Sequence, residues 1–335
     1  MKTIILTGGG TAGHIIPNLA LIPTLKKFFQ NIHYVGSTLM EESLVKNENI
    51  PFHKITSVKF DRSKLFSNFK IPILLKKGIN EASELIKNLS PDVIFSKGGY
   101  VSLPICFAAK KAHVPVVCHE SDYSLGLANK IVSRFSKKTL TSFPETPNGI
   151  YTGNPVRREI YNCPKTCFPS CLNPSKKTIL ICGGSLGSTA INSVVYKILP
   201  SLVQNYNVIH IAGNNGNFNI SYPDYVQLKY TDNFPQYLNM CDLVICRSGS
   251  NTLFECASLG KHCITVPLPK GASRGDQILN AQSFEKQGCC QVLPQSNLTP
   301  DVLLNSIDSA WNYSPKKINV EKINETIVKE IVTCL

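Results

Sequence analysis

The sequence predicts an α/β protein built from two doubly wound parallel sheets, one in each half of the chain. Short apolar runs rich in β-branched residues alternate with segments of helical spacing, which is typical of strands buried on both faces and joined by crossover helices. A glycine-rich turn follows the first strand of each half. The 335 residues fit two domains, because a domain usually has about 100–200 residues. We therefore expect two similar domains that face a cleft.

Ten apolar runs, five in each half, carry the strand prediction. Each run is short and ends at polar or turn residues, as strands of a buried sheet do. The runs are Thr3–Thr7, Ile32–Val35, Val93–Ser96, Val114–Cys118 and Lys138–Ser142, followed by Thr178–Cys182, Val208–Ala212, Tyr225–Leu228, Leu243–Cys246 and His262–Val266.

Two segments between these runs show the 3.6-residue apolar spacing of helices. The first contains Pro23, which should interrupt and kink the helix. Between the halves, Phe143–Lys177 is rich in Pro, Asn, Cys and Lys and is predicted to be a linker and the entry to the second domain. The apolar positions are Ile15, Leu19, Ile22 and Phe29 in the first segment, and Ile191, Val194, Val195, Ile198 and Leu202 in the second.

The charge of the chain favours an anionic partner. Lys and Arg outnumber Asp and Glu by 35 to 22, and residues 1–155 hold 19 basic against 10 acidic residues. Nucleic acid, phosphate groups or a membrane surface would suit this charge, and so would a merely basic soluble surface. The hydrophobic content of 43% argues against disorder. No apolar run approaches the roughly 18–20 residues that a membrane-spanning helix needs.

The cysteines indicate a reducing compartment. There are 13, an odd number, and they lie scattered through apolar runs, as buried free thiols do in cytosolic proteins. Cys163, Cys167 and Cys171 are evenly spaced, but no His or fourth Cys lies near them. We therefore expect no metal site and no cofactor.

Three glycine-rich turns each follow a strand and precede a helix: Gly8–His14, Ser96–Pro104 and Gly183–Ser188. Glycine lets a ligand approach the backbone, and a helix start offers free N–H groups and a positive dipole end. Turns at the carboxyl ends of parallel strands line one crevice. His14 is the candidate general base, with a capping histidine as the alternative. No Asp-x-Asp motif is present, so we expect backbone groups to neutralise a diphosphate without a metal.

Two polar stretches in the second half are candidate ligand contacts. In Arg247–Glu255, Ser250 or Asn251 is a candidate helix cap, and Glu255 could accept paired ribose hydroxyls. The alternative is that this carboxylate only complements the helix dipole. In Ser273–Ala281, Gln and Asp suit sugar hydroxyls, although helix starts are commonly polar.

The segment Lys59–Lys77 mixes six basic residues with large apolar side chains and contains one acid, Asp61. This composition suits an anionic membrane surface. A partly buried helix with a solvated basic face is the alternative. No nucleic-acid-binding module is recognisable, so we expect no nucleic acid partner.

Together these motifs resemble the MurG family, the UDP-N-acetylglucosamine:N-acetylmuramyl-(pentapeptide) pyrophosphoryl-undecaprenol N-acetylglucosaminyltransferases of peptidoglycan synthesis. Most of the motifs are weak singly, but their order and spacing are specific. The matching stretches are Gly8–His14, Gly98–Ser102, His119–Asp122, Gly126–Lys130, Asn154–Arg157, Gly183–Gly187, Arg247–Glu255 and Gln277–Ala281.

The resemblance implies a GT-B glycosyltransferase fold with two Rossmann-like domains. Residues 1–155 would form an acceptor-binding, membrane-facing domain, residues 156–319 a UDP-sugar-binding domain, and residues 320–335 a helix that returns to the first domain. It also implies an inverting, metal-independent hexosyltransferase that uses UDP-N-acetylglucosamine and lipid I. The enzyme would act in cell-wall synthesis, and so in cell shape and division, peripherally on the cytoplasmic face of the bacterial membrane.

The resemblance further implies residue roles. His14 matches the proposed general base, with Thr11, Ala12 and Gly13 near the diphosphate. The donor positions are Arg157 and the backbone at Thr231 for uracil, Ser185 for phosphate, Ser250, Asn251, Thr252 and Glu255 for sugar and ribose, and Gln277 for the N-acetylglucosamine hydroxyls. The acceptor-side positions are Gly98, Gly99, Tyr100 and Asp122.

Three features depart from the family pattern. Ala12 replaces the more usual glycine, Asp122 stands where many members have asparagine, and the stretch Cys163–Cys171 is unlike the family. Three other functions stay open from the sequence. They are a diacylglycerol-type lipid glycosyltransferase, a nucleotide-sugar 2-epimerase and a basic membrane-binding scaffold without enzyme activity.

Overall fold

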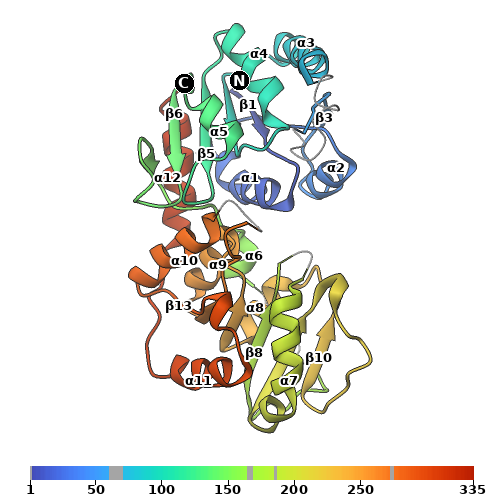
Figure 1. Ribbon diagram of the computed structural model, residues 1–335. Helices are drawn as coiled ribbons and strands as arrows, with labels where there is room; N and C mark the ends of the chain where they lie inside the picture. The colour runs from blue at the N-terminus through green and yellow to red at the C-terminus, as the bar shows by residue number, and fades with distance from the viewer. Residues whose placement is uncertain (1, 60–70, 164–168, 185–186, 272–274) are drawn as a thin grey trace. The chain divides into compact units, whose positions relative to one another are not determined.

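The computed structural model describes residues 2–59, 71–163, 169–184, 187–271 and 275–335, and the chain divides into two compact units (Figure 1). The first unit consists of Met1–Arg157 and Val320–Leu335, and the second of Arg158–Asn319. Each unit is built on one parallel sheet. In the described part of the chain, no helix combines the length and the apolar character needed to cross a bilayer.

The first sheet has seven strands in the order β3-β2-β1-β4-β5-β6-β7. Because β1 lies between β2 and β4, the strand order reverses at β1, which is the mark of a doubly wound sheet. The strands are β1 (Thr3–Thr7), β2 (Asn31–Gly36), β3 (Phe52–Lys54), β4 (Val93–Ser96), β5 (Val116–Glu120), β6 (Lys138–Thr141) and β7 (Ile150–Tyr151).

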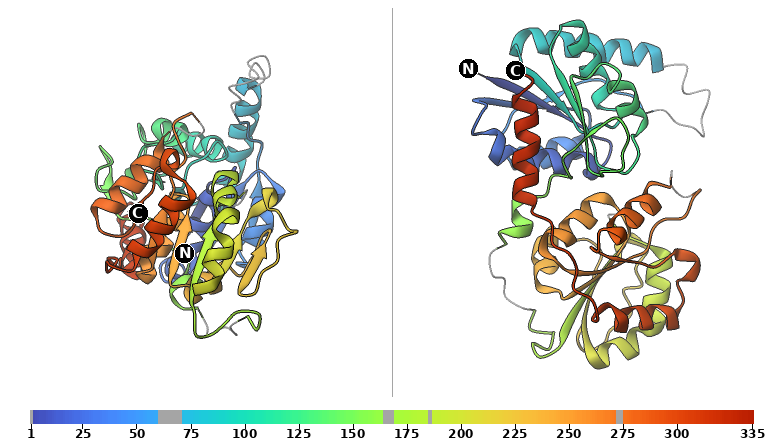
Figure 2. Two further views of the ribbon diagram at one scale, coloured as in Figure 1. Left: turned by 60° about the horizontal axis from the view of Figure 1, so that its bottom comes forward. Right: turned by 90° about the vertical axis from the view of Figure 1, so that its left-hand side faces the viewer.

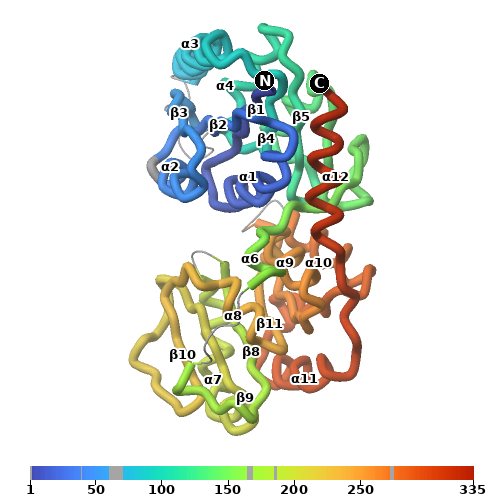
Figure 3. Tube along the Cα trace, turned by 180° about the vertical axis from the view of Figure 1, so that it is seen from behind, coloured from blue at the N-terminus to red at the C-terminus, as the bar shows by residue number. Residues whose placement is uncertain are grey.

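In the part of the first unit that the structure describes, six helices are present. Helices α3 and α4 pack against each other, and α12 packs against α1, so the end of the chain stabilises its beginning (Figures 2 and 3). The Asn324 amide also ties α12 to the segment after β7, accepting from Val156 N at 3.3 Å and donating to Val156 O at 3.0 Å. The helices are α1 (Ala12–Leu25), α2 (Leu39–Lys46), α3 (Ile71–Leu89), α4 (Ser102–Lys111), α5 (Leu127–Val132) and α12 (Val320–Val332).

The second sheet has six strands in the order β10-β9-β8-β11-β12-β13, with the reversal at β8. Its core joins the buried strands to the apolar faces of α7 and α11, through residues such as Ile181, Val195 and Ile307. The elements are β8 (Lys177–Cys182), α7 (Thr189–Asn205), β9 (Tyr206–Ile211), η2 (Gly213–Asn215), β10 (Tyr225–Leu228), α8 (Phe234–Met240), β11 (Leu243–Cys246), α9 (Ser250–Leu259), β12 (His262–Thr265), α10 (Asp276–Lys286), β13 (Gln291–Val292), η3 (Gln295–Asn297) and α11 (Pro300–Ala310).

The structure corrects several element predictions. Helix α1 runs through both Pro17 and Pro23 and ends at Leu25, so Pro23 does not interrupt it. The segment predicted as a linker holds β7, which pairs with β6, and the single-turn helix α6 (Arg158–Tyr161). The small edge strands β3, β7 and β13 were not predicted, because runs of two or three residues give no periodicity.

Candidate active site

The second unit contains a cavity of about 490 Å³ at the carboxyl ends of β8 and β11. These neighbouring strands form the switch point of the sheet, where open α/β sheets bind ligands. Helices α7, α9 and α10 all begin in or beside its wall. The lining residues are Cys182, Gly183, Gly184, Gly187, Ser188, Thr189, Ala190, Cys246, Arg247, Gly249, Thr252, Leu268, Pro269, Gln277 and Gln295.

This cavity, which we call the nucleotide pocket, has an electropositive wall. Neither α7 nor α9 carries an acidic residue in its first turn, so the positive ends of both helix dipoles are uncompensated there. Ser188 caps α7 by accepting a hydrogen bond from Ile191 N at 3.3 Å. Arg247 is buried, and its Nη1 donates to Val266 O at 3.0 Å. Burial lowers the pKa of Arg247, but a guanidinium group stays charged in proteins.

Two glycines of the pocket serve different purposes. Gly187 has φ +78°, and a Cβ there would lie 2.1 Å from the carbonyl oxygen of Ala212. Close backbone packing therefore requires glycine at this position. Gly184 has φ +84°, but a Cβ there would meet nothing within 4 Å. Its backbone thus faces open space beside the start of α7.

Helix α9 carries four residues that were predicted to bind the sugar donor. The expectation that Ser250 or Asn251 caps this helix is wrong, because the cap is Gly249, which makes no side-chain cap bond. Ser250 lies in the first turn, and among the described residues its buried Oγ has no hydrogen-bond partner. Thr252 lines the pocket, whereas Glu255 is buried in the second turn.

The other residues predicted to bind the sugar donor do not all line this pocket. Gln277 lines the pocket and accepts a hydrogen bond from Leu268 N at 3.0 Å through Oε1. Thr231 follows β10, where its hydroxyl accepts from Asn233 N at 3.0 Å, and it does not line the pocket. Arg157 belongs to the first unit. Ser185 lies outside the described residues.

In the first unit the turns after β1 and β4 touch each other at the switch point of the sheet. A Cβ at Gly99 would lie 2.3 Å from Gly9 O, and one at Gly10 would lie 2.7 Å from the Tyr100 ring. The two predicted motifs therefore form one surface, with Gly98 buried beneath it.

His14 lies in the first turn of α1, half-buried. Its Nδ1 is 3.1 Å from the hydroxyl of Thr11, the residue that precedes the helix. Ala12 and Gly13 complete the same turn. In the tautomer in which Nδ1–H donates to this hydroxyl, the contact orients the imidazole and leaves the lone pair on Nε2, which can accept a proton.

Glu41, which was not predicted from the sequence, supports the glycine-rich turn after β1 through hydrogen bonds. Its side chain is fully buried and accepts hydrogen bonds from the backbone N–H groups of Gly10 (2.9 Å), Thr38 (3.0 Å) and Ser37. Thr38 and Glu41 form a capping box at the start of α2. The spacing Thr-x-x-Glu is the signal that could have identified it.

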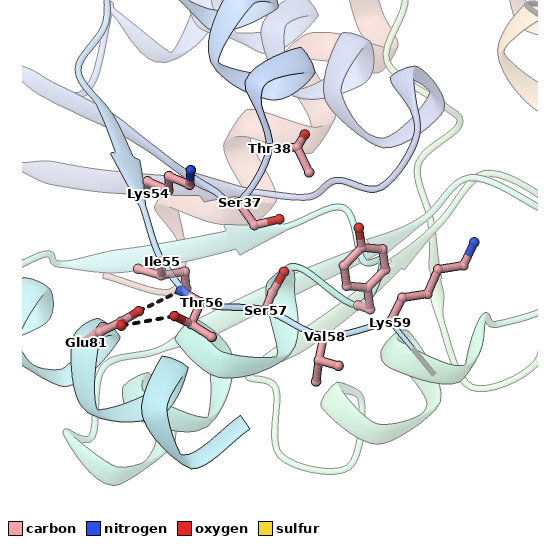
Figure 4. A pocket seen from close by; sticks show the side chains of 10 residues that line it. Ser37, Thr38, Lys54, Ile55, Thr56, Ser57, Val58, Lys59 and Glu81 are labelled. Atoms are coloured by element: carbon pink, nitrogen blue, oxygen red, sulfur yellow. Dashed lines mark hydrogen bonds between the residues drawn. The ribbon is translucent and has the colours of Figure 1, made fainter. Parts of the chain in front are cut away.

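A second cavity, of about 580 Å³, opens at the ends of β2 and β3 (Figure 4). Glu81 of α3 anchors its wall by accepting from Thr56 N (2.6 Å) and Thr56 Oγ1 (3.0 Å). Lys54 and Lys59 give it a basic rim. We call it the lysine pocket, and its lining residues are Ser37, Thr38, Lys54, Ile55, Thr56, Ser57, Val58, Lys59, Glu81 and Tyr100.

Among the described residues, one group of thiols is close enough to share an ion: Cys246, Cys256 and Cys263 lie within 4.8 Å of one another. All three are buried between the sheet and α9, and the sulfurs of Cys246 and Cys263 are 3.8 Å apart. Apolar burial of small side chains accounts for them. Cys167 of the evenly spaced cysteines lies outside the described residues.

Two family domains match the chain. Residues 4–141 match the glycosyltransferase family 28 N-terminal domain, and residues 178–333 match the family 28 C-terminal domain. Together they contain both glycine-rich sites described above.

Named relatives agree with this match. The chain is 42% identical, over 94% of its length and 92% of the relative's, to a UDP-N-acetylglucosamine–N-acetylmuramyl-(pentapeptide) pyrophosphoryl-undecaprenol N-acetylglucosamine transferase of Clostridium novyi. It is 41% identical over 99% of both chains to the enzyme numbered 3 of that name in Bacillus thuringiensis. The crystal structure of Acinetobacter baumannii MurG has the same fold, with a TM-score of 0.74, 24% identity and coverage of 99% of this chain and 100% of that one. The chain therefore belongs to glycosyltransferase family 28 and, within it, to the MurG family.

Proposed function

We propose that this enzyme transfers N-acetylglucosamine from UDP-N-acetylglucosamine to the C4 hydroxyl of a lipid-diphosphate-linked N-acetylmuramyl peptide, converting lipid I to lipid II. Relatives that cover nearly the whole chain carry the name of this reaction. The observation that carries the proposal is the nucleotide pocket, where the starts of α7, α9 and α10 converge at a switch point.

The nucleotide pocket suits the diphosphate of the donor. Backbone N–H groups and helix dipoles at the starts of α7 and α9 would stabilise the charge that develops as UDP leaves. The open backbone at Gly184 lets a phosphate approach closely. The unpartnered hydroxyl of Ser250 and the side chain of Gln277 supply polar contacts for the sugar.

The uridine end of the donor would be held by residues farther from this pocket. We assign Glu255 to the ribose hydroxyls, and Arg157 and the backbone at Thr231 to the uracil. These assignments rest on the matching motifs. Ser185, Asn251 and Thr252 complete the proposed donor set, with Thr252 in the wall of the pocket.

In the proposed chemical step, His14 Nε2 removes the proton from the acceptor C4 hydroxyl. The oxygen attacks the anomeric carbon, the bond from that carbon to the diphosphate breaks, and the configuration inverts. Thr11 orients the imidazole through Nδ1, and Ala12 and Gly13 offer backbone groups near the diphosphate. General base catalysis contributes typically about 10²–10⁴-fold.

The acceptor would bind to the first unit. Gly98, Gly99 and Tyr100 form one surface with the glycine turn that precedes His14. Tyr100 also lines the lysine pocket, so the same surface continues into a basic cavity. Lys54 and Lys59 suit anionic groups of the acceptor, which carries a diphosphate and peptide carboxylates.

Because the proposed acceptor carries a lipid, the enzyme would meet it at a membrane surface. We therefore propose peripheral binding on the cytoplasmic face. The start of α3 exposes Ile73 (72%) beside the exposed Lys76 and Lys77. This pairing of an apolar side chain with cations suits anionic lipid headgroups. The rest of the predicted basic segment, residues 60–70, lies outside the described residues.

A transfer assay tests the proposal. Radiolabelled UDP-N-acetylglucosamine is mixed with lipid I, and the lipid fraction is examined for label. We expect a labelled lipid product and free UDP. Label transferred to diacylglycerol, or release of an epimerised free sugar without a lipid acceptor, would replace this function with one of the two rival activities.

A further inference from the structure

The ammonium group of Lys97 lies buried under the turn that follows β4, with no exposed side-chain surface. Nζ donates to His119 Nδ1 at 2.7 Å and to Asn154 Oδ1 at 3.1 Å. His119 Nε2 donates to Gly153 O at 2.9 Å, which leaves the ring lone pair on Nδ1 toward the lysine. Burial and the neighbouring cation lower the pKa of His119 well below its usual value, so the ring is neutral.

Two carboxylates of the adjoining strand end face this cation. Glu120 is buried and accepts from the backbone N–H groups of Asp122 (3.1 Å) and Gly126 (2.8 Å) and from Asn129 Nδ2 (2.9 Å). It therefore fixes the loop that leads to α5. Both Glu120 and Asp122 act to raise the pKa of Lys97, although burial holds it at about 7. The groups that face Lys97 are thus one neutral imidazole and two carboxylates.

We propose that Lys97 is a positioning residue whose buried charge offsets Glu120 and Asp122 and thereby permits an anionic acceptor to approach residues 98–100. This inference rests on the proposed function, because the anion is the acceptor diphosphate. A buried lysine beneath a glycine turn has no packing advantage over an apolar side chain of the same length, since its desolvation is unfavourable. The charge of Lys97 also explains how the chain accommodates an aspartate at position 122.

The proposal has a definite pH signature. Below pH 7 Lys97 carries a proton and cancels one of the two carboxylates. Above pH 7 it becomes neutral and no longer offsets them, so the two carboxylates repel the acceptor more strongly. We therefore expect kcat/KM for the acceptor to fall as the pH rises through about 7, while KM for UDP-N-acetylglucosamine stays constant. His14 acting as a general base gives the opposite slope, because a base gains activity as it loses its proton.

The test is a double-mutant cycle in the full-length enzyme with lipid I as acceptor. Lys97→Met should lower kcat/KM for lipid I at pH 6 by at least tenfold and abolish its decline above pH 7. Asp122→Asn should move that decline to lower pH, because one group that raises the lysine pKa is gone. The double variant should recover part of the loss. Lys111→Met, which removes an exposed lysine at the end of α4, serves as the control and should retain the wild-type profile.

Thermal unfolding gives a readout that does not need activity. The contribution of Lys97 to stability should grow between pH 7 and 10, because the unfolded lysine still binds the proton that the folded one has lost. Buried thiols such as Cys106 and Cys241, whose pKa burial raises, lower stability in this range in both proteins, so the contribution is read as the difference between the wild type and the variant. The Lys97→Met variant should lack this increment. An unchanged pH profile in Lys97→Met, or strictly additive effects in the cycle, would overturn the proposal while leaving transfer to lipid I established in the wild type.

Discussion

His14 is the residue on which the proposed chemical step depends. Replacing it with Ala should lower kcat by about 10²–10⁴-fold, the usual contribution of a general base. UDP affinity should be nearly unchanged, because His14 is not assigned to the nucleotide and does not line the nucleotide pocket. Transfer kinetics and calorimetric titration with UDP measure the two effects separately. A variant as active as the wild type would remove His14 from the mechanism.

Glu41 acts on the same turn through hydrogen bonds. In Glu41→Gln one carboxylate oxygen becomes an NH₂ group that faces backbone donors, and an unsatisfied buried group costs about 1–3 kcal/mol. We expect a loss of that size in the free energy of unfolding, measured by urea denaturation. Glu42→Gln is the matched control, since Glu42 on the same helix forms a partly exposed ion pair with Lys46. Equal losses in both variants would contradict the buried role of Glu41.

The sequence predicted residues that line the nucleotide pocket better than residues that lie buried behind the glycine-rich turns. Gln277 and Thr252 do line the nucleotide pocket, because motifs after strand ends meet at a switch point. Lys97 and Glu41 were missed as functional groups. Their partners lie far along the chain, 57 positions away for the Lys97–Asn154 bond and 31 for the Gly10–Glu41 bond. The Thr-x-x-Glu spacing indicates a capping role for Glu41, but no local pattern encodes these long-range bonds.

At the scale of elements, the ten predicted strands are all present, since β-branched runs buried on both faces are unambiguous. Boundaries were less certain: β5 begins at Val116, two residues after the predicted Val114. The failed cap prediction on α9 has a local cause. Gly249 takes the extended cap conformation, so Ser250 falls within the helix and its hydroxyl cannot reach the free N–H groups.

The loop between β8 and α7 allows a paired test of packing against ligand approach. Gly187→Ala places a methyl group against Ala212 O and should reduce stability strongly. Gly184→Ala meets no neighbouring atom, so it should cost only the roughly 1–2 kcal/mol of left-handed strain, yet weaken UDP binding. Thermal unfolding and UDP titration of both variants measure these outcomes. Full UDP affinity in a folded Gly184→Ala variant would exclude Gly184 from the phosphate site.

Over the whole molecule, the two sheets repeat one design. Each has its strand reversal at the first strand, β1 or β8, and each places a glycine turn and a helix start at that point. The first unit adds a histidine and a basic cavity, and the second adds three helix starts around one pocket. The same backbone physics thus provides the proposed acceptor side and the proposed donor side, which differ in their side chains.

In the proposed membrane binding, the net charge of +13 acts over the whole molecule in addition to the surface of α3. We expect the protein to sediment with vesicles that contain phosphatidylglycerol, and to be released by salt, because screening weakens the attraction of cations to anionic lipid. Ile73→Glu should lower the bound fraction several-fold, since it places a carboxylate where an apolar side chain meets the headgroups. Phe218→Glu replaces another exposed apolar side chain, which lies in the second unit and is 48% exposed, and should leave binding almost unaltered. Equal loss in both variants would show that net charge, rather than the α3 surface, holds the enzyme at the membrane.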